Sequence, residues 1–395
     1  MTFKLFGNLV FAIVTALALA ACGGGGGGGG IGGTGSSDMG TLHVVMTDAP
    51  ACGYDAVNIT VDRVRVHLSS SAVDADTGWS EIVLSPAKRI NLLSLANGVL
   101  EDLGRTALPA GTYTQMRLVL APNDTAHPLA NSVVPSGGSE TALTTPSAQQ
   151  SGIKLNMNVE VAADKVADVA LDFDACKSVV KRGASGQYNL KPVIAVTPLL
   201  SDAGLRVVGY VDPLIALGST TISLQSGGAP VKSTVPDATG QFTLYPVPTG
   251  TYDLVVTAAG RVTAVMTGVP VVTTAFTQVN TTALGFLPPL ATVRAVSGSV
   301  TPATATVRAL QALTGGPTVE VAWGSVDAGS GAFALALPIG APVRAAYAAN
   351  PSAIVFVADP GAAGKYTLEA ASAGTTKNQA IDTGAAVPLV TFTLP

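Results

Sequence analysis

The chain has 395 residues and a net charge of −4, with only 12% charged residues, and this weak acidic balance gives no indication of a nucleic-acid partner. Its 44 glycines and 25 prolines, together with abundant Val and Thr, favour an all-β protein of short strands over a helical one. The length is sufficient for two or three domains.

The first 21 residues have the organisation of a secretory signal peptide. Lys4 supplies a positive charge, and the uncharged apolar stretch 5–19 that follows is shorter than the roughly 20 residues of a membrane span. The segment 1–21 leads into Leu19-Ala20-Ala21-Cys22, which resembles the lipobox of bacterial lipoproteins. That resemblance implies cleavage before Cys22 and attachment of fatty acyl chains such as palmitate to this cysteine, and hence to the membrane. The alternative is an ordinary signal peptide with a cysteine there by chance.

Residues 22–39 predict a tether between the lipid and the folded part of the chain. Eight glycines in a row, Gly23–Gly30, are followed by further Gly, Ser and Thr. Such a segment has no side chains to bury and stays a flexible coil, with a reach on the order of 25 Å. Gly23 stands where an aspartate would retain an enterobacterial lipoprotein in the inner membrane. By that analogy we expect an outer-membrane protein facing the periplasm or the cell surface.

A first domain is expected over residues 40–200, and its first half alternates as β-strands do. The continuous apolar run 42–46 predicts a central strand. In residues 57–68 the alternation slips at Asp62-Arg63, which predicts a β-bulge. One short helix is expected within 90–103, because apolar side chains recur there at helical spacing. These side chains are Leu92, Leu95, Val99 and Leu103.

The second half of this domain predicts further strands. Residues 116–120 and 169–173 each place apolar side chains at every second position. Residues 153–161 alternate apolar and polar side chains throughout, as in a strand with one face in water. The continuous apolar run 193–196 predicts another central strand.

Five short motifs mark the same domain. They are Thr47-Asp48-Ala49-Pro50, Val61–His67 with Gly78-Trp79, Leu92-Leu93-Ser94-Leu95, Pro109-Ala110-Gly111-Thr112-Tyr113 and Asp172-Phe173-Asp174-Ala175-Cys176. Together they resemble an uncharacterised bacterial family, the domain of unknown function 4382, which is usually found on lipoproteins. The resemblance covers nearly the whole domain and implies a β-sandwich-like module. It implies no activity, so no functional residue is carried over from it.

Lipidation of Cys22 leaves two further cysteines, Cys52 and Cys176. Disulfides persist in oxidising compartments such as the periplasm, so we expect these two cysteines to be joined. Closing so long a loop gives roughly 5 kcal/mol of stabilisation in the chain-entropy model, as an upper figure. Two free buried thiols are the alternative.

Two smaller, similar β domains are expected over residues 205–290 and 295–395. Their shared order is a glycine, an alternating Phe-x-Leu and a Pro-x-Gly turn. This order resembles the carboxypeptidase regulatory-like, transthyretin-like β-sandwich, which implies a spacer, stalk or binding module, and some relatives bind carbohydrate. The second copy lacks the tyrosine that follows the turn in the first, Tyr252. The corresponding positions are Gly209 and Gly298, Gly240 and Gly331, Phe242 and Phe333, Leu244 and Leu335, Pro248 and Pro338, and Gly250 and Gly340.

The common catalytic and cofactor motifs find little support. The sequence has no Gly-x-Ser-x-Gly elbow. Its histidines, His43, His67 and His127, form no ligand cluster with cysteine, and those in predicted strands are expected to be structural. The run Gly361-Ala-Ala-Gly364-Lys365 is too short for a phosphate-binding loop. We therefore expect no enzyme, no cofactor and no metal site.

Two pairs of aspartates are possible cation ligands. The run Asp74-Ala-Asp76-Thr-Gly78 begins like a calcium loop but lacks the third ligand and the glutamate, so a solvated turn before Trp79 is expected. Asp172 and Asp174 are expected on one face of one strand, as weak candidates for a cation site or for glycoside hydrolysis. Lys177 is close enough in sequence to neutralise one of them.

The sequence as a whole predicts a non-enzymatic envelope lipoprotein with a binding or scaffolding role at the outer membrane. Its expected partner is an envelope protein or a glycan. One alternative is a carbohydrate-binding surface protein, although aromatic residues are only 5% of the chain and predict no aromatic-rich sugar platform. The other alternative is a hydrolase that uses Asp172 and Asp174.

Overall fold

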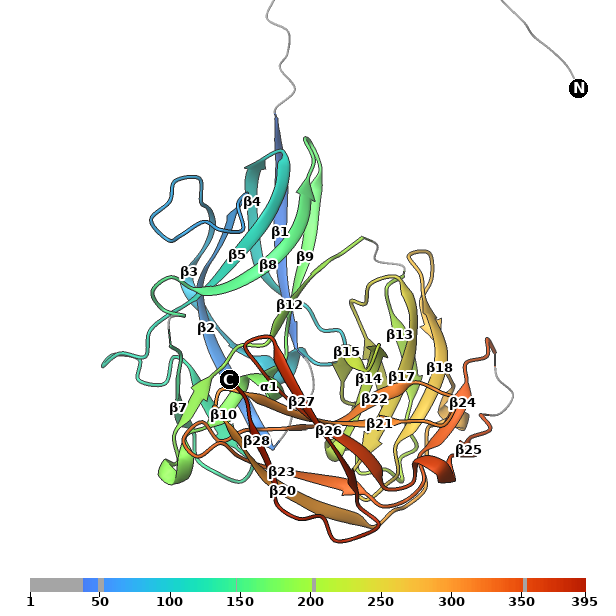
Figure 1. The fold of residues 1–395 in the computed structure, drawn as a ribbon. Coiled ribbons are helices and arrows are strands. Elements are labelled where there is room, and N and C mark those ends of the chain that lie inside the picture. Colours follow the sequence, from blue (N-terminus) through green and yellow to red (C-terminus); the bar gives the residue numbers. More distant parts are fainter. Residues whose placement is uncertain (1–37, 49–52, 147, 201–203, 351–353) are drawn as a thin grey trace, which may run out of the picture. The chain divides into compact units, whose positions relative to one another are not determined.

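A computed structural model describes residues 38–48, 53–146, 148–200, 204–350 and 354–395 of the chain. These residues belong to one compact unit. They are almost entirely β-strands, which confirms the predicted all-β class. The strands form three β-sandwiches, named here the first (38–200), second (204–290) and third sandwich (293–395) (Figure 1). The helices are short: α1 (Ala175–Ser178), η1 (Leu92–Leu95), η2 (Gly183–Ser185), η3 (Leu217–Ser219), η4 (Thr282–Leu284) and η5 (Pro360–Ala362). No helix of the described ranges is both long and apolar enough to cross a membrane.

The first sandwich packs a small sheet against a large one. The small sheet has the order β12-β9-β1-β4, in which β1 is central and runs parallel to β9. Its strands are β1 (Met39–Asp48), β4 (Glu101–Pro109), β9 (Val166–Phe173) and β12 (Ile194–Pro198). The large sheet consists of β2 (Tyr54–His67), β3 (Ser80–Asn91), β5 (Gly111–Leu120), β6 (Ser132–Pro135), β7 (Thr141–Thr144), β8 (Ile153–Val161), β10 (Val179–Lys181) and β11 (Tyr188–Leu190).

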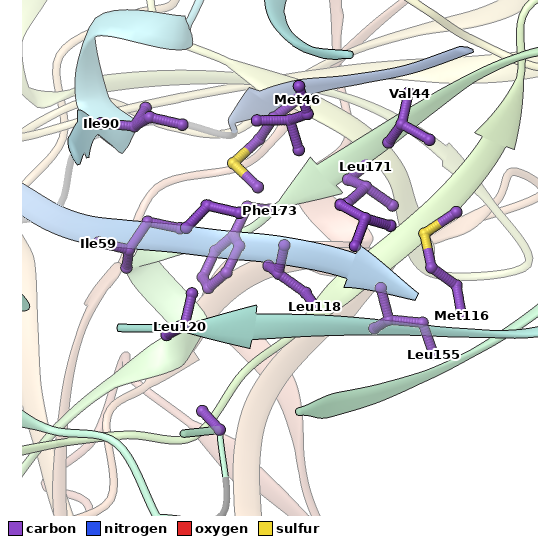
Figure 2. Packing of buried hydrophobic residues seen from close by; sticks show 14 of the residues in the cluster. Val44, Met46, Ile59, Ile90, Met116, Leu118, Leu120, Leu155, Leu171 and Phe173 are labelled. Atoms are coloured by element: carbon purple, nitrogen blue, oxygen red, sulfur yellow. The ribbon is translucent and has the colours of Figure 1, made fainter. Parts of the chain in front are cut away.

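One hydrophobic core fills the space between these two sheets. Met46 and Leu171 from the small sheet pack with Ile59, Leu118 and their neighbours from the large sheet (Figure 2). All four of these side chains are completely buried. Each contributes about 1.5–3 kcal/mol of hydrophobic stabilisation relative to an exposed position.

Several strands follow the sequence pattern closely. In β8 every second side chain from Leu155 to Val161 is buried while the polar ones between them are exposed, so the predicted one-sided strand is confirmed. The register of β2 against β3 and β5 shifts between Val61 and Arg63, which confirms the predicted bulge. The run 42–46 lies in the central strand β1, also as predicted.

One expectation for the first sandwich is met over a shorter span, and one is wrong. The short helix expected within 90–103 is the 3₁₀ helix η1 alone, because Asn97 and Gly98 adopt positive φ angles and turn the chain into β4. Residues 193–196 do not form a central strand, since β12 lies at the edge of its sheet and pairs only with β9.

The second and third sandwiches have the same strand order. The orders are β16-β13-β19 with β15-β14-β17-β18 in the second, and β23-β20-β28 with β22-β21-β26-β27 in the third. The second contains β13 (Val207–Tyr210), β14 (Thr220–Ser226), β15 (Ala229–Thr234), β16 (Gln241–Leu244), β17 (Gly250–Ala258), β18 (Ala264–Val271) and β19 (Thr277–Gln278). The third contains β20 (Val293–Thr301), β21 (Thr306–Ala312), β22 (Thr318–Gly324), β23 (Ala332–Pro338), β26 (Lys365–Ser372), β27 (Thr375–Asp382) and β28 (Val390–Thr393).

The tyrosine that the third sandwich lacks after its turn is present farther along the chain. In the second sandwich the Tyr252 hydroxyl donates to the Pro248 carbonyl at 2.9 Å. In the third, the Tyr366 hydroxyl donates to the corresponding Pro338 carbonyl at 2.7 Å, from 28 residues away. The second copy thus lacks a tyrosine directly after its turn, as its sequence shows, but makes the same contact with Tyr366. A third such contact occurs in the first sandwich, where the Tyr113 hydroxyl donates to Pro109 at 3.1 Å.

An insertion between Pro338 and Tyr366 explains this displacement. It carries β24 (Val343–Ala346) and β25 (Val357–Ala358). These strands do not join the third sandwich, because β24 pairs in parallel with β18 at the edge of the second. The buried side chain of Val343 packs into the core of the second sandwich. The two copies are therefore joined by a shared sheet instead of being separate modules.

Candidate functional site

The predicted acidic pair is divided between two structural roles. Asp172 lies in β9, whereas β9 ends at Phe173 and Asp174 follows it as the N-cap of α1. The expectation that both carboxylates lie on one strand face is therefore wrong. The Asp174 carboxylate accepts a hydrogen bond from the Lys177 N–H at 3.0 Å, which satisfies a free donor of the first helical turn.

Asp172 is engaged by a lysine from the second sandwich. The Nζ of Lys232, in β15, lies 2.5 Å from the Asp172 carboxylate. The Lys232 side chain is 1% exposed and that of Asp172 is 11% exposed, so water screens this ion pair little. Burial raises the pKa of the Asp172 carboxyl, while Lys232 opposes the shift. This pair joins the first and second sandwiches.

A second group of charges joins the first and third sandwiches. The Lys177 ammonium lies 3.0 Å from Glu320 in β22 and 3.8 Å from Asp174. It also lies 4.7 Å from the centre of the Trp323 ring, within the range of a cation–π contact. Burial raises the pKa of Asp174, which Lys177 counteracts. Lys177 thus has the role of neutralising Asp174 that the sequence suggested for it, and it contacts Glu320 as well.

Glu320 is the common point of these contacts. Its second carboxylate oxygen lies 3.3 Å from Arg308, which also pairs with Glu369 at 2.7 Å. Its backbone N–H donates to the Gln225 side chain of the second sandwich at 2.8 Å, and its backbone carbonyl accepts from the same amide at 2.8 Å. Glu320 is therefore bonded to groups of all three sandwiches. We name the set Asp172, Asp174, Lys177, Gln225, Lys232, Arg308 and Glu320 the polar junction.

A cleft of about 330 Å³ opens beside the polar junction. Its walls include Asp174, Lys177 and Glu320 together with the hydroxyl of Ser223 and the half-buried ring of Trp323. Both acids in these walls are already paired, Asp174 and Glu320 with Lys177 and Glu320 also with Arg308, so the cleft suits a neutral polar ligand better than an ion. Within the described part of the chain, no group of three or more His, Cys, Asp or Glu side chains is placed to hold a metal ion.

Asp48 is a further buried acid next to this region. It ends β1 and is 1% exposed, and its carboxylate accepts a hydrogen bond from the Ala175 N–H at 2.9 Å. Its second carboxylate oxygen has no hydrogen-bond partner among the described residues. Burial raises the pKa of Asp48 well above its usual value, and the nearby carboxylates of Asp174 and Asp172 add to the shift.

Replacing Asp48 by asparagine should change how stability depends on pH. Because the folded-state pKa is raised, the folded state holds this proton more tightly than the unfolded chain. The stabilisation from the protonated carboxyl is fully present below the unfolded pKa of about 3.9 and is lost as the pH rises through the folded pKa. We therefore expect Asp48→Asn to gain stability relative to the native chain between pH 4 and pH 8, as measured by urea denaturation.

The exposed Asp124 provides a control of opposite sign. Backbone N–H groups of His127 and Ala126 donate to its carboxylate and lower its pKa. Asp124→Asn should therefore lose stability relative to the native chain as the pH rises through the lowered folded pKa to the unfolded pKa of about 3.9, and the difference should stay constant above it. Parallel pH profiles for the native chain and Asp48→Asn would contradict the raised pKa of Asp48.

The cysteine predictions fall largely outside the described residues. Cys22 and Cys52 both lie there, so lipidation and the Cys52–Cys176 disulfide stay predictions. Cys176 is described and lies in α1. The hydrogen bond from Ala175 to Asp48 brings α1 beside the end of β1, shortly before Cys52 in the sequence.

The histidines in predicted strands have structural partners. The ring nitrogens of His43 lie 2.6 Å from Asp168 and 3.2 Å from Asp102, which fastens β1 to both of its neighbours. His67 lies 3.0 Å from the Thr77 carbonyl and accepts from the backbone at Ser69. The structural role predicted for these two histidines is confirmed.

Two rejected motifs are also used structurally. In the run 74–78, Asp74 pairs with Arg65, and Asp76 accepts from the Val73 N–H at 2.9 Å, as in the expected turn before Trp79. The run 361–365 leads from η5 into β26, and Lys365 donates to the Gly361 carbonyl at 2.9 Å. Neither run has the surroundings of the ligand site that it resembles.

Comparison with known proteins finds a family model that matches the first sandwich. Residues 39–192 match the family model described as "Domain of unknown function (DUF4382)". The first sandwich is similar to this domain. This match confirms the resemblance that the sequence motifs indicated there, and the family description names no activity. No curated protein matches the chain.

Likenesses to solved structures are distant. Two mutants of a type II cohesin–X-dockerin complex from Acetivibrio cellulolyticus match 22% of this chain, with 26% and 28% identity and TM-scores of 0.20 and 0.17. The Bacillus anthracis TIE protein matches 90% of this chain with 10% identity and a TM-score of 0.16. The matches cover 59%, 56% and 50% of those chains, which is less than two thirds of their length. We draw nothing about function from these likenesses.

Four residues of the polar junction were not expected from the sequence, namely Gln225, Lys232, Arg308 and Glu320. Each lies in a short strand of the second or third sandwich, and no local motif surrounds it. The first-sandwich members Asp172, Asp174 and Lys177 were singled out, but as a site for a ligand and not as contacts between sandwiches. Only the tertiary structure brings the two groups together.

Proposed function

We propose that this chain is a non-enzymatic envelope lipoprotein that binds or scaffolds a partner at the outer membrane. The observation that carries the proposal is the use of the acidic groups at the polar junction. Asp172 is held by Lys232, and Glu320 by Lys177 and Arg308, so these carboxylates hold the sandwiches together. Three sandwiches that are joined by buried ion pairs and anchored through a lipid and a glycine tether can present a fixed surface to a partner.

The second and third sandwiches fit this role as spacer or binding modules. We assign them to the carboxypeptidase regulatory-like type on their shared strand order and their Pro-x-Gly turns. The Tyr252 and Tyr366 contacts to those turns support the assignment. The hydrolase alternative fits less well, because Lys232 occupies the carboxylate of Asp172 that it would need.

A glycan is the second candidate partner, and the cleft beside the polar junction favours it. Trp323 forms part of a wall that also carries hydroxyl and amide groups, from Ser223 and Gln225. Sugars are recognised by such a combination of an apolar ring face and hydrogen-bonding side chains. Glycan-array binding that is lost in Trp323→Ala and kept in Trp79→Phe would favour this candidate over a protein partner.

The lipid anchor is tested by replacing Cys22 with alanine. Without the thiol no lipid can be attached, and we expect the chain to move from the membrane fraction to the soluble or unprocessed fraction. Cys176→Ala serves as the control, because it removes a cysteine without touching the lipobox and should leave the protein on the membrane. Continued membrane attachment of Cys22→Ala would contradict the anchor.

The binding role is tested by crosslinking in intact envelopes followed by affinity purification of the full chain. We expect a defined envelope protein or glycan to be recovered with the native chain and with an Asp172→Asn, Asp174→Asn variant that is shown to be folded. Turnover of a glycoside by the native chain, lost in the same folded variant, would instead establish the hydrolase and contradict the proposal.

A further inference from the structure

A second, mainly apolar groove of about 300 Å³ lies between the first and third sandwiches. Val180 and Val193 of the first sandwich and Ala303 and Val326 of the third are part of its walls. Small-molecule sites measure about 300–1,000 Å³ and are lined mainly by apolar side chains with a few placed polar groups. The groove has the size and the composition of a site for a small ligand.

One of its polar groups is the ammonium of Lys191. This group donates a hydrogen bond to the Thr304 carbonyl, and both residues line the groove. No ion pair among the described residues includes Lys191, unlike Lys177, which lines the same groove but is paired with Glu320. Burial lowers the pKa of Lys191, as expected for a cation without a carboxylate beside it.

The other polar group is the side-chain amide of Asn189. Its buried Oδ1 lacks a hydrogen-bond partner within the described ranges, and Asn189 lines the same groove. The oxygen and nitrogen of an amide exchange places by a half-turn of the side chain, so Asn189 can equally present an N–H donor here. A buried polar group without a partner carries a desolvation penalty, which a bound ligand would relieve.

We propose that this groove binds a small apolar carboxylate of the fatty-acid type. The carboxylate accepts hydrogen bonds from the Lys191 ammonium and the Asn189 amide, and the hydrocarbon chain lies along the valines and alanines of the walls. The negative charge is matched to the one cation of the groove that lacks a carboxylate, while the chain removes apolar surface from water. The groove shares Lys177 and Trp323 with the cleft proposed for glycans, whereas Lys191 and Asn189 line the groove only, and the inference goes beyond the proposed scaffolding role.

The test compares octanoate with octanol, which has the same chain without the charge. Trp323 lines the groove, and the only other tryptophan is Trp79, so fluorescence of the full chain with Trp79→Phe reports on Trp323 alone. Because Trp323 also lines the cleft beside the polar junction, a response that is lost in Ala303→Phe is required to place the ligand in the groove. We expect octanoate to bind at least about tenfold more tightly than octanol, the effect of a charge-assisted hydrogen bond. Lys191→Met should abolish this preference.

Two further variants keep the test specific. Lys365→Met is the matched control, because Lys365 also donates to a backbone carbonyl but is exposed and far along the chain from the groove, and octanoate binding should be unchanged. Ala303→Phe places a ring in the groove and should block both ligands. Circular dichroism and urea denaturation establish that each variant is folded.

Several outcomes would overturn the proposal. They are equal binding of octanoate and octanol, unchanged octanoate binding by folded Lys191→Met, and no binding of either ligand. A short apolar peptide with a free carboxyl terminus is included as a competitor. Binding of this peptide without binding of octanoate would overturn the assignment to fatty acids.

Discussion

Replacing Lys232 by methionine is expected to lower the free energy of unfolding by about 3 kcal/mol at pH 7.5, because it leaves a buried carboxylate without its cation. The Asp172 side chain is only 11% exposed, so water cannot replace the lost partner. The loss should become smaller toward pH 4.5, since the unpaired carboxyl can then take up a proton. Urea denaturation at the two pH values measures both effects.

Two variants separate the buried pair from charge removal in general. The double variant Lys232→Met, Asp172→Leu removes both charges and should recover most of the lost stability. Lys88→Met breaks the exposed pair with Glu101, whose side chains are 41% and 32% exposed, and should cost less than about 1 kcal/mol. A similar loss in Lys88→Met and Lys232→Met would mean that burial of the Asp172 pair has no special weight.

Replacing Gly331 by alanine is expected to destabilise the chain by about 3 kcal/mol or more. Gly331 has a φ of +70°, which costs an L-residue about 1–2 kcal/mol. The added Cβ would also lie 2.2 Å from the Val300 carbonyl oxygen, a backbone atom, so β20 would have to shift. Such overpacking adds about 1–3 kcal/mol. Thermal and urea denaturation measure the sum.

Gly374 provides the matched control for this prediction. It has a φ of +80°, but nothing lies within 4 Å of the Cβ that alanine would add. Gly374→Ala should therefore cost only the backbone strain, about 1–2 kcal/mol. Equal losses of unfolding free energy in Gly331→Ala and Gly374→Ala would contradict the prediction, because the close contact with the Val300 carbonyl would then add nothing to the backbone strain.

The corresponding turn of the second sandwich requires a glycine for the same reason. Gly240 has a φ of +83°, and its added Cβ would lie 2.5 Å from the Val211 carbonyl. A glycine at this point of both copies is thus explained by a close backbone approach at a left-handed position. The pairing of Gly240 with Gly331 was predicted from sequence spacing alone, and the shared geometry supports it.

Local patterns predicted the elements that depend on local physics. The alternation in 153–161 placed the buried face of β8 correctly, and the slip at Asp62-Arg63 placed the bulge in β2. The short helix expected within 90–103 is confined to η1, because the apolar residues farther along this range lie in a turn and in the strand β4. The central strand expected at 193–196 failed because an apolar run indicates burial but not the order of strands.

The third sandwich shows how an insertion hides a correspondence. Pro338 and Tyr366 are 28 residues apart, whereas Pro248 and Tyr252 are 4 apart, so equal spacing could not find the pair. The hydrogen bond restores it, because the tyrosine must reach the carbonyl of the turn whatever chain lies between. The inserted strand β24 meanwhile joins a sheet of the other copy.

The sequence by itself determined the all-β class, the faces of individual strands and the motifs that match the DUF4382 domain, because each depends on residues close together in the chain. Only the tertiary structure decided what the acidic pair does. Asp172 finds Lys232 at a separation of 60 residues, and Lys177 finds Glu320 at 143. Such contacts follow from how whole sheets pack, which no local pattern records. The packing of the sheets brings Asp172 and Lys177 to their partners in the second and third sandwiches.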